Sequence, residues 1–107
     1  MPAFVRKVEK YIQENYSEQI TSQTLADEFG FVPSYISKLF SMYLDTSPKK
    51  YLTRVRIDKA KDILEKVPNI KVIEVAQKVG FNDAQYFSKV FHEQTGAWPS
   101  EYKNNNQ

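Results

Sequence analysis

Apolar residues recur along this chain at intervals of three or four positions, the spacing that places side chains on one face of an α-helix. No segment alternates β-branched and polar residues, so no strand is predicted. The pattern therefore predicts an all-α protein. The residues expected to face inward are Phe4, Val5, Val8, Tyr11, Ile12, Tyr16, Leu25, Ala26, Phe29, Ile36, Leu39, Phe40, Tyr43, Leu52, Val55, Ala60, Ile63, Leu64, Val67, Val72, Ile73, Val75, Ala76, Val79, Phe87, Val90 and Phe91.

Hydroxyl residues, glycines and prolines divide this pattern into six helices and a final turn. Hydroxyl side chains suit helix N-caps, glycine suits a left-handed helix end, and proline suits a first turn. The expected boundaries are Thr21 or Ser22 and Gly30 for the second helix, Pro33 for the start of the third, Pro48 and Pro68 for the fourth, Lys71 and Gly80 for the fifth, Pro99 to Lys103 for the last turn, and 104–107 for a frayed tail.

The two halves of the chain repeat one another. The matches at an offset of 50 join Ile20, Leu25, Ala26, Gly30 and Phe31 to Ile70, Val75, Ala76, Gly80 and Phe81. Those at an offset of 51 join Tyr35, Ser37, Lys38, Phe40, Pro48 and Tyr51 to Tyr86, Ser88, Lys89, Phe91, Pro99 and Tyr102. The extra residue falls just after the Gly-Phe pair, in a turn, where insertions are tolerated. The sequence thus contains two copies of a helix, a glycine turn and a second helix.

A short helix, a glycine-containing turn and a second helix form a helix-turn-helix, whose second helix can enter a DNA major groove. In one copy alone, outward polar residues fit ordinary solvent exposure equally well; two matched copies favour DNA reading. The outward residues are Ser34, Tyr35, Ser37 and Lys38 in the first copy, and Asp83, Ala84, Gln85, Ser88 and Lys89 in the second.

Charge adds a weaker indication. The chain carries a formal net charge of +2, and the basic excess lies in residues 47–66. A helix over 48–66 would be about 28 Å long, compatible with readers at adjacent grooves. Lys49 and Lys50 at its start are expected to contact phosphate. Arg56 and Lys59 fit an internal pairing as well as they fit a DNA contact.

The residues resemble the AraC/XylS family of bacterial transcription regulators from about Ile12 to Tyr102. The most specific segments are Val75–Phe81, Tyr86–Phe91 and Thr95–Tyr102, together with Pro33–Phe40 and Tyr51–Ala60. The resemblance implies a seven-helix fold with two helix-turn-helix subdomains, 1–47 and 68–107, joined by a central helix over 48–67. It implies that the third and sixth helices are the readers, in adjacent major grooves. It also implies that the protein regulates transcription, and activation is more common in the family than repression.

The resemblance also implies roles for particular residues. With Tyr35 added from the outward pattern, the expected base readers are Ser34, Ser37, Lys38, Ala84, Gln85, Ser88 and Lys89. Apart from the resemblance, the expected phosphate contacts are Thr21, Ser22, Lys49, Lys50, Lys71 and His92. For His92, an ordinary surface position is the favoured alternative. The expected partners are double-stranded DNA, RNA polymerase, and a sensor or receiver domain on the N-terminal side, including the kind found in two-component response regulators. The bacterial cytoplasm is the expected location.

Four positions depart from the family pattern. Lys38 and Lys89 stand where arginine is common, and lysine lacks the planar bidentate fork of arginine. Asp45 stands where glycine is usual; aspartate tolerates a left-handed backbone at some cost. Trp98 replaces a smaller residue and is expected to pack on the last subdomain.

Two other functional classes fit the sequence less well. An enzyme is disfavoured because no phosphate loop, carboxylate pair or histidine–nucleophile pair is recognisable, and the absence of cysteine excludes thiol chemistry. No cofactor or metal is expected, and no membrane span or signal peptide is recognisable. A helical protein-interaction module explains the amphipathic helices but not the duplicated outward faces.

Overall fold

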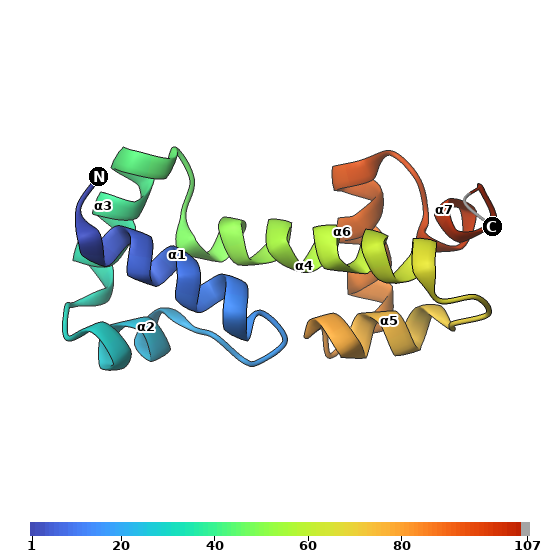
Figure 1. Ribbon diagram of the computed structural model, residues 1–107, viewed down its shortest axis with the longest axis horizontal. Helices are drawn as coiled ribbons and strands as arrows, with labels where there is room; N and C mark the ends of the chain where they lie inside the picture. Colours follow the sequence, from blue (N-terminus) through green and yellow to red (C-terminus); the bar gives the residue numbers. More distant parts are fainter. Residues whose placement is uncertain (106–107) are drawn as a thin grey trace. The chain divides into compact units, whose positions relative to one another are not determined.

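The computed structural model describes residues 1–105, which fold into seven α-helices with no strand among them (Figure 1). The all-α, seven-helix prediction is confirmed. The last helix includes residues 104 and 105, where a frayed tail was predicted; residues 106 and 107 lie outside the described part. The helices are α1 (Ala3–Asn15), α2 (Ser22–Phe29), α3 (Pro33–Leu44), α4 (Pro48–Lys66), α5 (Val72–Val79), α6 (Ala84–Thr95) and α7 (Pro99–Asn105).

The chain packs as two units, Met1–Val55 and Arg56–Gln107. The dividing point lies inside α4, so each half of this helix packs with a different unit. The predicted subdomain boundaries after residues 47 and 67 stay a prediction. Each unit is described below by itself.

Each unit has its own apolar core, made of residues that the helical spacing placed inward. Burial of such side chains contributes about 1.5–3 kcal/mol each, which is the main stabilisation of helices this short. The first core contains Val5, Val8, Ile12, Leu25, Ile36, Phe40 and Leu52. Buried in the second unit are Ile57, Ala60, Leu64, Ile70, Val75, Ala76, Val79, Phe81, Phe87, Val90 and Phe91.

The duplication extends further than the sequence comparison found. Val5, Val8 and Ile12 of α1 are buried, and so are the residues 52 positions later, Ile57, Ala60 and Leu64 of α4. The second half of α4 therefore serves the second unit as α1 serves the first. The residue types differ at each pair, which is why identity matching missed the relation.

A tyrosine closes the core of each unit in the same way. Tyr51 packs edge-on against Phe40, with 5.5 Å between ring centroids. Tyr102, 51 positions later, packs edge-on against Phe91 at 5.6 Å. Edge-to-face packing suits the quadrupoles of both rings. The first turn of α4 and the first turn of α7 are thus equivalent elements of the two units.

The hydroxyl groups of these two tyrosines are satisfied within the protein. Gln13 Nε2 donates a hydrogen bond to the Tyr51 hydroxyl at 2.6 Å. The Tyr102 hydroxyl donates to Glu65, which lies 52 positions after Gln13. Burial raises the pKa of Tyr51, and the bond to the Glu65 carboxylate raises the pKa of Tyr102 to about 12. Both phenols are therefore protonated at neutral pH, and their hydrogen bonds join α4 to α1 and α7 to α4.

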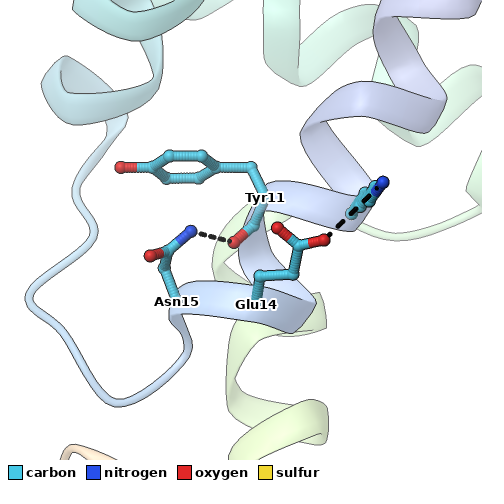
Figure 2. A network of polar contacts seen from close by, with 4 residues as sticks. Tyr11, Glu14 and Asn15 are labelled. Atoms are coloured by element: carbon cyan, nitrogen blue, oxygen red, sulfur yellow. Dashed lines mark hydrogen bonds and ion pairs between the residues drawn. The ribbon is translucent and has the colours of Figure 1, made fainter.

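The C-terminal turn of α1 is held by local contacts (Figure 2). Asn15 Nδ2 donates to the Tyr11 carbonyl oxygen at 2.9 Å, a side-chain bond one turn back along the helix. Lys10 and Glu14 pair at 3.7 Å on the exposed side and contribute little. The Tyr11 ring packs edge-on against Phe29 at 5.7 Å, joining α1 to α2.

Glycines end the helices where the sequence predicted them. Gly30 ends α2 with φ 75° and Gly80 ends α5 with φ 104°. Their amides donate back to the carbonyl of Ala26 and to those of Ala76 and Gln77. A side chain is strained in this left-handed region, so glycine permits the sharp change of direction before the next helix.

Asp45 ends α3 in a left-handed conformation, which aspartate tolerates. Its φ is 56° and its ψ 30°, and its amide donates to the Ser41 carbonyl at 2.9 Å. The equivalent residue in the second unit, 51 positions later, is Gly96 with φ 83°. Both α3 and α6 thus end at a residue in the left-handed conformation, aspartate in the first unit and glycine in the second.

Asp45→Gly is expected to raise the free energy of unfolding by about 0.5–1 kcal/mol, because glycine adopts this conformation without a Cβ penalty. Urea denaturation followed by circular dichroism measures the change. The reciprocal variant Gly96→Asp is expected to lower stability by a similar amount. A lower stability of Asp45→Gly would mean that the aspartate side chain makes a contact that outweighs the strain.

Three residues predicted to face inward are exposed. Tyr43, Val67 and Ile73 expose 47%, 42% and 52% of their surface. Tyr43 lies in the last turn of α3 and Val67 follows the end of α4, where the neighbouring helices no longer cover them. Ile73 lies in the first turn of α5, on the side of the helix away from the buried Val75 and Val79 at ~100° per residue.

Ile57 is the opposite case, a core residue that the pattern did not identify. It is 1% exposed, although Arg56 and Asp58 flank it in the sequence. The apolar stripe of α4 changes register where the helix passes from one unit to the other. A single continuous apolar stripe that starts at Leu52 therefore does not include Ile57.

Candidate nucleic-acid interface

The first helix-turn-helix begins with a double cap. The Thr21 hydroxyl accepts from the Thr24 amide at 3.1 Å, and the Thr24 hydroxyl accepts from the Thr21 amide at 3.1 Å. This capping box fixes the start of α2. Thr21 and Ser22, both predicted phosphate contacts, are exposed at this end. Thr21 therefore already has a structural role, and its phosphate contact stays a prediction.

On α3 the predicted readers spread around the side opposite the core. Ile36 and Phe40 are buried, and Lys38 lies almost opposite them at ~100° per residue. Ser34 is exposed on one flank of Lys38, and Ser37 is half-buried near the core side. Lys38 is thus best placed to extend away from the unit.

On α6 the same geometry recurs. Lys89 lies opposite the buried Phe87 and Phe91, as Lys38 does on α3. Gln85 is exposed at the position equivalent to Ser34. Ala84, at the first position of the helix, and Ser88 are half-buried, as Ser37 is on α3.

Asp83 has a different role from the other outward residues of the second copy. Its Oδ1 accepts hydrogen bonds from the Gln85 amide at 2.8 Å and the Tyr86 amide at 3.2 Å. It is therefore the N-cap of α6, a contribution of about 1 kcal/mol. The first copy has Val32 at the N-cap of α3, with no side-chain cap. The carboxylate fixes the first turn of the recognition helix in the second unit.

Aromatic rings pack at the start of α3. Tyr35, predicted as a base reader, stacks on Phe4 of α1 with 5.9 Å between centroids and an interplanar angle of 11°. Phe31 lies 4.7 Å from Phe4 and 5.3 Å from Tyr35. These contacts hold the Tyr35 ring against α1, to one side of the outermost position on α3. Its base contact stays a prediction.

In the second unit a cation replaces one of these rings. Tyr86 lies 6.1 Å from Phe81, the same pair as Tyr35 and Phe31. The Arg56 guanidinium lies 5.5 Å from the centre of the Phe81 ring. Arg56 is the equivalent of Phe4 in the second unit, 52 positions later in the sequence. Arg56 is half-buried, and burial lowers its pKa. Its contact with the aromatic ring favours the internal role that the sequence left open.

The predicted lysine contacts with phosphate are exposed at helix starts. Lys49 and Lys50 lie in the first turn of α4, where the Ser47 hydroxyl accepts from the Lys50 amide at 3.1 Å. Lys71 is the N-cap of α5, equivalent to Thr21 of the first copy. Partial positive charge at helix N-termini adds to the attraction of these side chains for phosphate.

His92 and Trp98 form a stacked pair next to α6. Their ring centroids are 4.2 Å apart with an interplanar angle of 23°. His92 is half-buried, while 45% of the Trp98 surface remains exposed. Trp98 thus packs on α6 through His92 while much of its surface stays accessible. The predicted phosphate contact of His92 stays a prediction.

Tyr86 was absent from the residues predicted to bind DNA. Its equivalent, Tyr35, was among them, and the repeat offset of 51 links the two directly. Tyr86 is 55% exposed. The duplication itself was the signal that could have added Tyr86 to the candidate surface.

The helix-turn-helix domain family matches residues 25–105 of this chain. The raffinose operon transcriptional regulatory protein RafR of Pediococcus pentosaceus is 40% identical over 93 residues, 87% of this chain and 33% of RafR. The C-terminal domain of AraT, a response regulator from Geobacillus stearothermophilus, has a TM-score of 0.92 and 28% identity, over 97% of this chain and 86% of that one. A probable AraC family transcriptional regulator from Rhodopseudomonas palustris has a TM-score of 0.86 and 29% identity, over 96% of both chains.

The chain spans about a third of the length of the curated relatives it matches, for example 32% and 33% of two of them. The similarity therefore concerns one part of those proteins. Within residues 1–105, no helix combines the length and apolar character needed to cross a membrane.

Proposed function

Because the chain belongs to the AraC family of helix-turn-helix transcription regulators and binds DNA in that role, we propose that α3 and α6 are its two recognition helices. In this proposal they enter adjacent major grooves of one duplex and read bases through Ser34, Ser37, Lys38, Ala84, Gln85, Ser88 and Lys89. The phosphate contacts are Thr21, Ser22, Lys49, Lys50, Lys71 and His92.

The observation that carries this proposal is the matched placement of one lysine on each helix. Lys38 and Lys89 are both exposed, and both lie opposite the two buried residues that anchor their helix. Lysine in a major groove can donate to guanine O6 and N7. A duplicated outward lysine on two anchored helices supports two reading elements in one chain.

Selection of bound sequences from a random duplex library, at two salt concentrations, tests the proposal. The expected result is a site with two unlike blocks about one helical turn apart. A single enriched block would mean that only one helix reads bases. Retention without enrichment would leave non-specific binding, and no retention would favour the protein-interaction module.

Lys89→Ala is expected to change base preference at one position of one block, with a loss of about 1–3 kcal/mol against the preferred base. The matched variant Lys38→Ala is expected to act at one position of the other block. Selection with each variant, compared with the unaltered chain, measures the change. If Lys89→Ala weakens every sequence equally, Lys89 contacts phosphate and is not a reader.

We further propose a regulatory setting for this DNA-binding region. Its role is binding and not catalysis, because its family consists of DNA-binding regulators. We place it in the bacterial cytoplasm, where its DNA ligand is. We also propose that it activates transcription, through contact with RNA polymerase. A sensing or receiver domain on the N-terminal side of the regulator supplies the signal, since matched relatives are about three times as long.

A further inference from the structure

Two pairs of tyrosines are repeated between the units, each at an offset of 51: Tyr51 with Tyr102, and Tyr35 with Tyr86. The first pair has its hydroxyls bonded inside the protein, to Gln13 and Glu65. In the part of the chain that the structure describes, neither Tyr35 nor Tyr86 has a hydrogen-bond partner for its hydroxyl. The two pairs therefore differ in what their hydroxyl groups are available to bind.

The rings of Tyr35 and Tyr86 are nevertheless held in place. Tyr35 packs on Phe31 at 5.3 Å, and Tyr86 packs on Phe81 at 6.1 Å. They remain 44% and 55% exposed. A phenol anchored by its ring loses little conformational freedom when its hydroxyl binds a ligand, so the contact is preorganised. Phenylalanine would serve the packing equally well, which leaves the hydroxyl without a role inside the protein.

The position of each tyrosine on its helix indicates the ligand. At ~100° per residue, Tyr35 and Ser34 lie on opposite flanks of Lys38, and Tyr86 and Gln85 lie on opposite flanks of Lys89. A helix lying in a major groove points its outermost residues at the base edges. Tyr35 and Tyr86 lie ~60° from these outermost lysines and carry long side chains, so they reach the groove walls, which are lined by phosphates. Ser34 and Gln85 lie only ~40° from the lysines and stay nearer the base edges. Tyrosine hydroxyls are among the groups that bind phosphate oxygens.

We propose that the hydroxyls of Tyr35 and Tyr86 donate hydrogen bonds to phosphodiester oxygens, one at each recognition helix. They set the depth and register of α3 and α6 without reading sequence. This inference rests on the proposed function of those helices, and it assigns Tyr35 to phosphate in place of the predicted base contact. It adds Tyr86 as its equivalent in the second unit.

Tyr35→Phe and Tyr86→Phe remove only the hydroxyls and keep the packed rings. Each is expected to lower affinity for the selected duplex about three- to ten-fold, and both together about 10- to 100-fold. The same factors are expected for a scrambled duplex. The slope of log affinity against log salt is expected to stay unchanged, because a neutral hydroxyl releases no counterion. The matched control is Tyr43→Phe, an exposed tyrosine at the other end of α3, expected to leave affinity unchanged.

Single methylphosphonate substitutions along the duplex locate each contact. At one phosphate, the loss of affinity seen with the unaltered chain is expected to shrink in Tyr35→Phe, and at a second phosphate in Tyr86→Phe. Affinities equal to the Tyr43→Phe control would overturn the inference, as would a change of preference at a single base pair. Failure of the unaltered chain to bind any duplex would instead refute the proposed function itself.

Discussion

Phe91→Ala is expected to lower the free energy of unfolding by about 3–5 kcal/mol, the largest stability effect we expect from one substitution. Phe91 has no exposed surface and packs against Phe87 at 5.8 Å and Tyr102 at 5.6 Å. Its removal leaves a cavity between α6 and α7 that these rings cannot fill without leaving their own contacts. Domains of this size are stable by only about 5–15 kcal/mol, so the loss is a large fraction of the total.

Urea denaturation followed by circular dichroism measures this effect. Phe40→Ala removes the equivalent ring of the first unit, which packs on Tyr51 at 5.5 Å, and is expected to cost a similar amount. Val32→Ala is the surface control, because Val32 is 64% exposed, and its effect is expected within about 0.5 kcal/mol. A loss below about 1.5 kcal/mol for Phe91→Ala would show that the second unit collapses around the gap or is loosely packed.

The double variant Lys49→Ala, Lys50→Ala is expected to show the largest effect on DNA binding. If each lysine neutralises one phosphate, the slope of log affinity against log salt falls in magnitude by about 2. The same counterion release gives a loss of roughly 60-fold in affinity at 0.1 M salt. Because phosphate contacts carry no sequence information, the loss is expected for selected and scrambled duplexes alike. Titrations of fluorescently labelled duplex at several salt concentrations measure both quantities.

The matched control for the lysine pair removes the same charge elsewhere. Lys10 and Lys66 each pair with a carboxylate one turn away, at 3.7 Å with Glu14 and at 2.8 Å with Asp62. Lys10→Ala with Lys66→Ala is expected to leave the salt slope close to that of the unaltered chain. An equal reduction in both double variants would indicate a general effect of net charge and remove Lys49 and Lys50 from the phosphate contacts.

Most of the fold could be predicted because its signals are local. Gly30, Gly80 and the prolines at helix starts act on their own backbone, so their positions reveal the boundaries directly. The register change inside α4 could not be predicted, because it depends on which unit covers which half of the helix. Ile57 was missed for this reason: burial is decided by neighbours that are distant in the sequence.

The candidate site was predicted less completely than the fold. The lysines on α3 and α6 were identified because the repeat places them at the same point of each helix. The capping role of Asp83 was missed, since an aspartate before a helix fits both an outward surface and a cap. The hydroxyls of Tyr51 and Tyr102 are hydrogen-bonded to Gln13 and Glu65, and no sequence motif links these residues to the tyrosines. Only the three-dimensional packing distinguishes these roles.

The stacked pair of His92 and Trp98 has a consequence for following the two units separately. Trp98 is the only tryptophan in the sequence, and it belongs to the second unit. Its fluorescence, sensitive to the imidazole ring 4.2 Å away, reports the state of that unit alone. Helical content reports both units together. Divergence of the two signals during denaturation would therefore reveal independent melting of the duplicated halves, and coincidence would reveal a single cooperative transition.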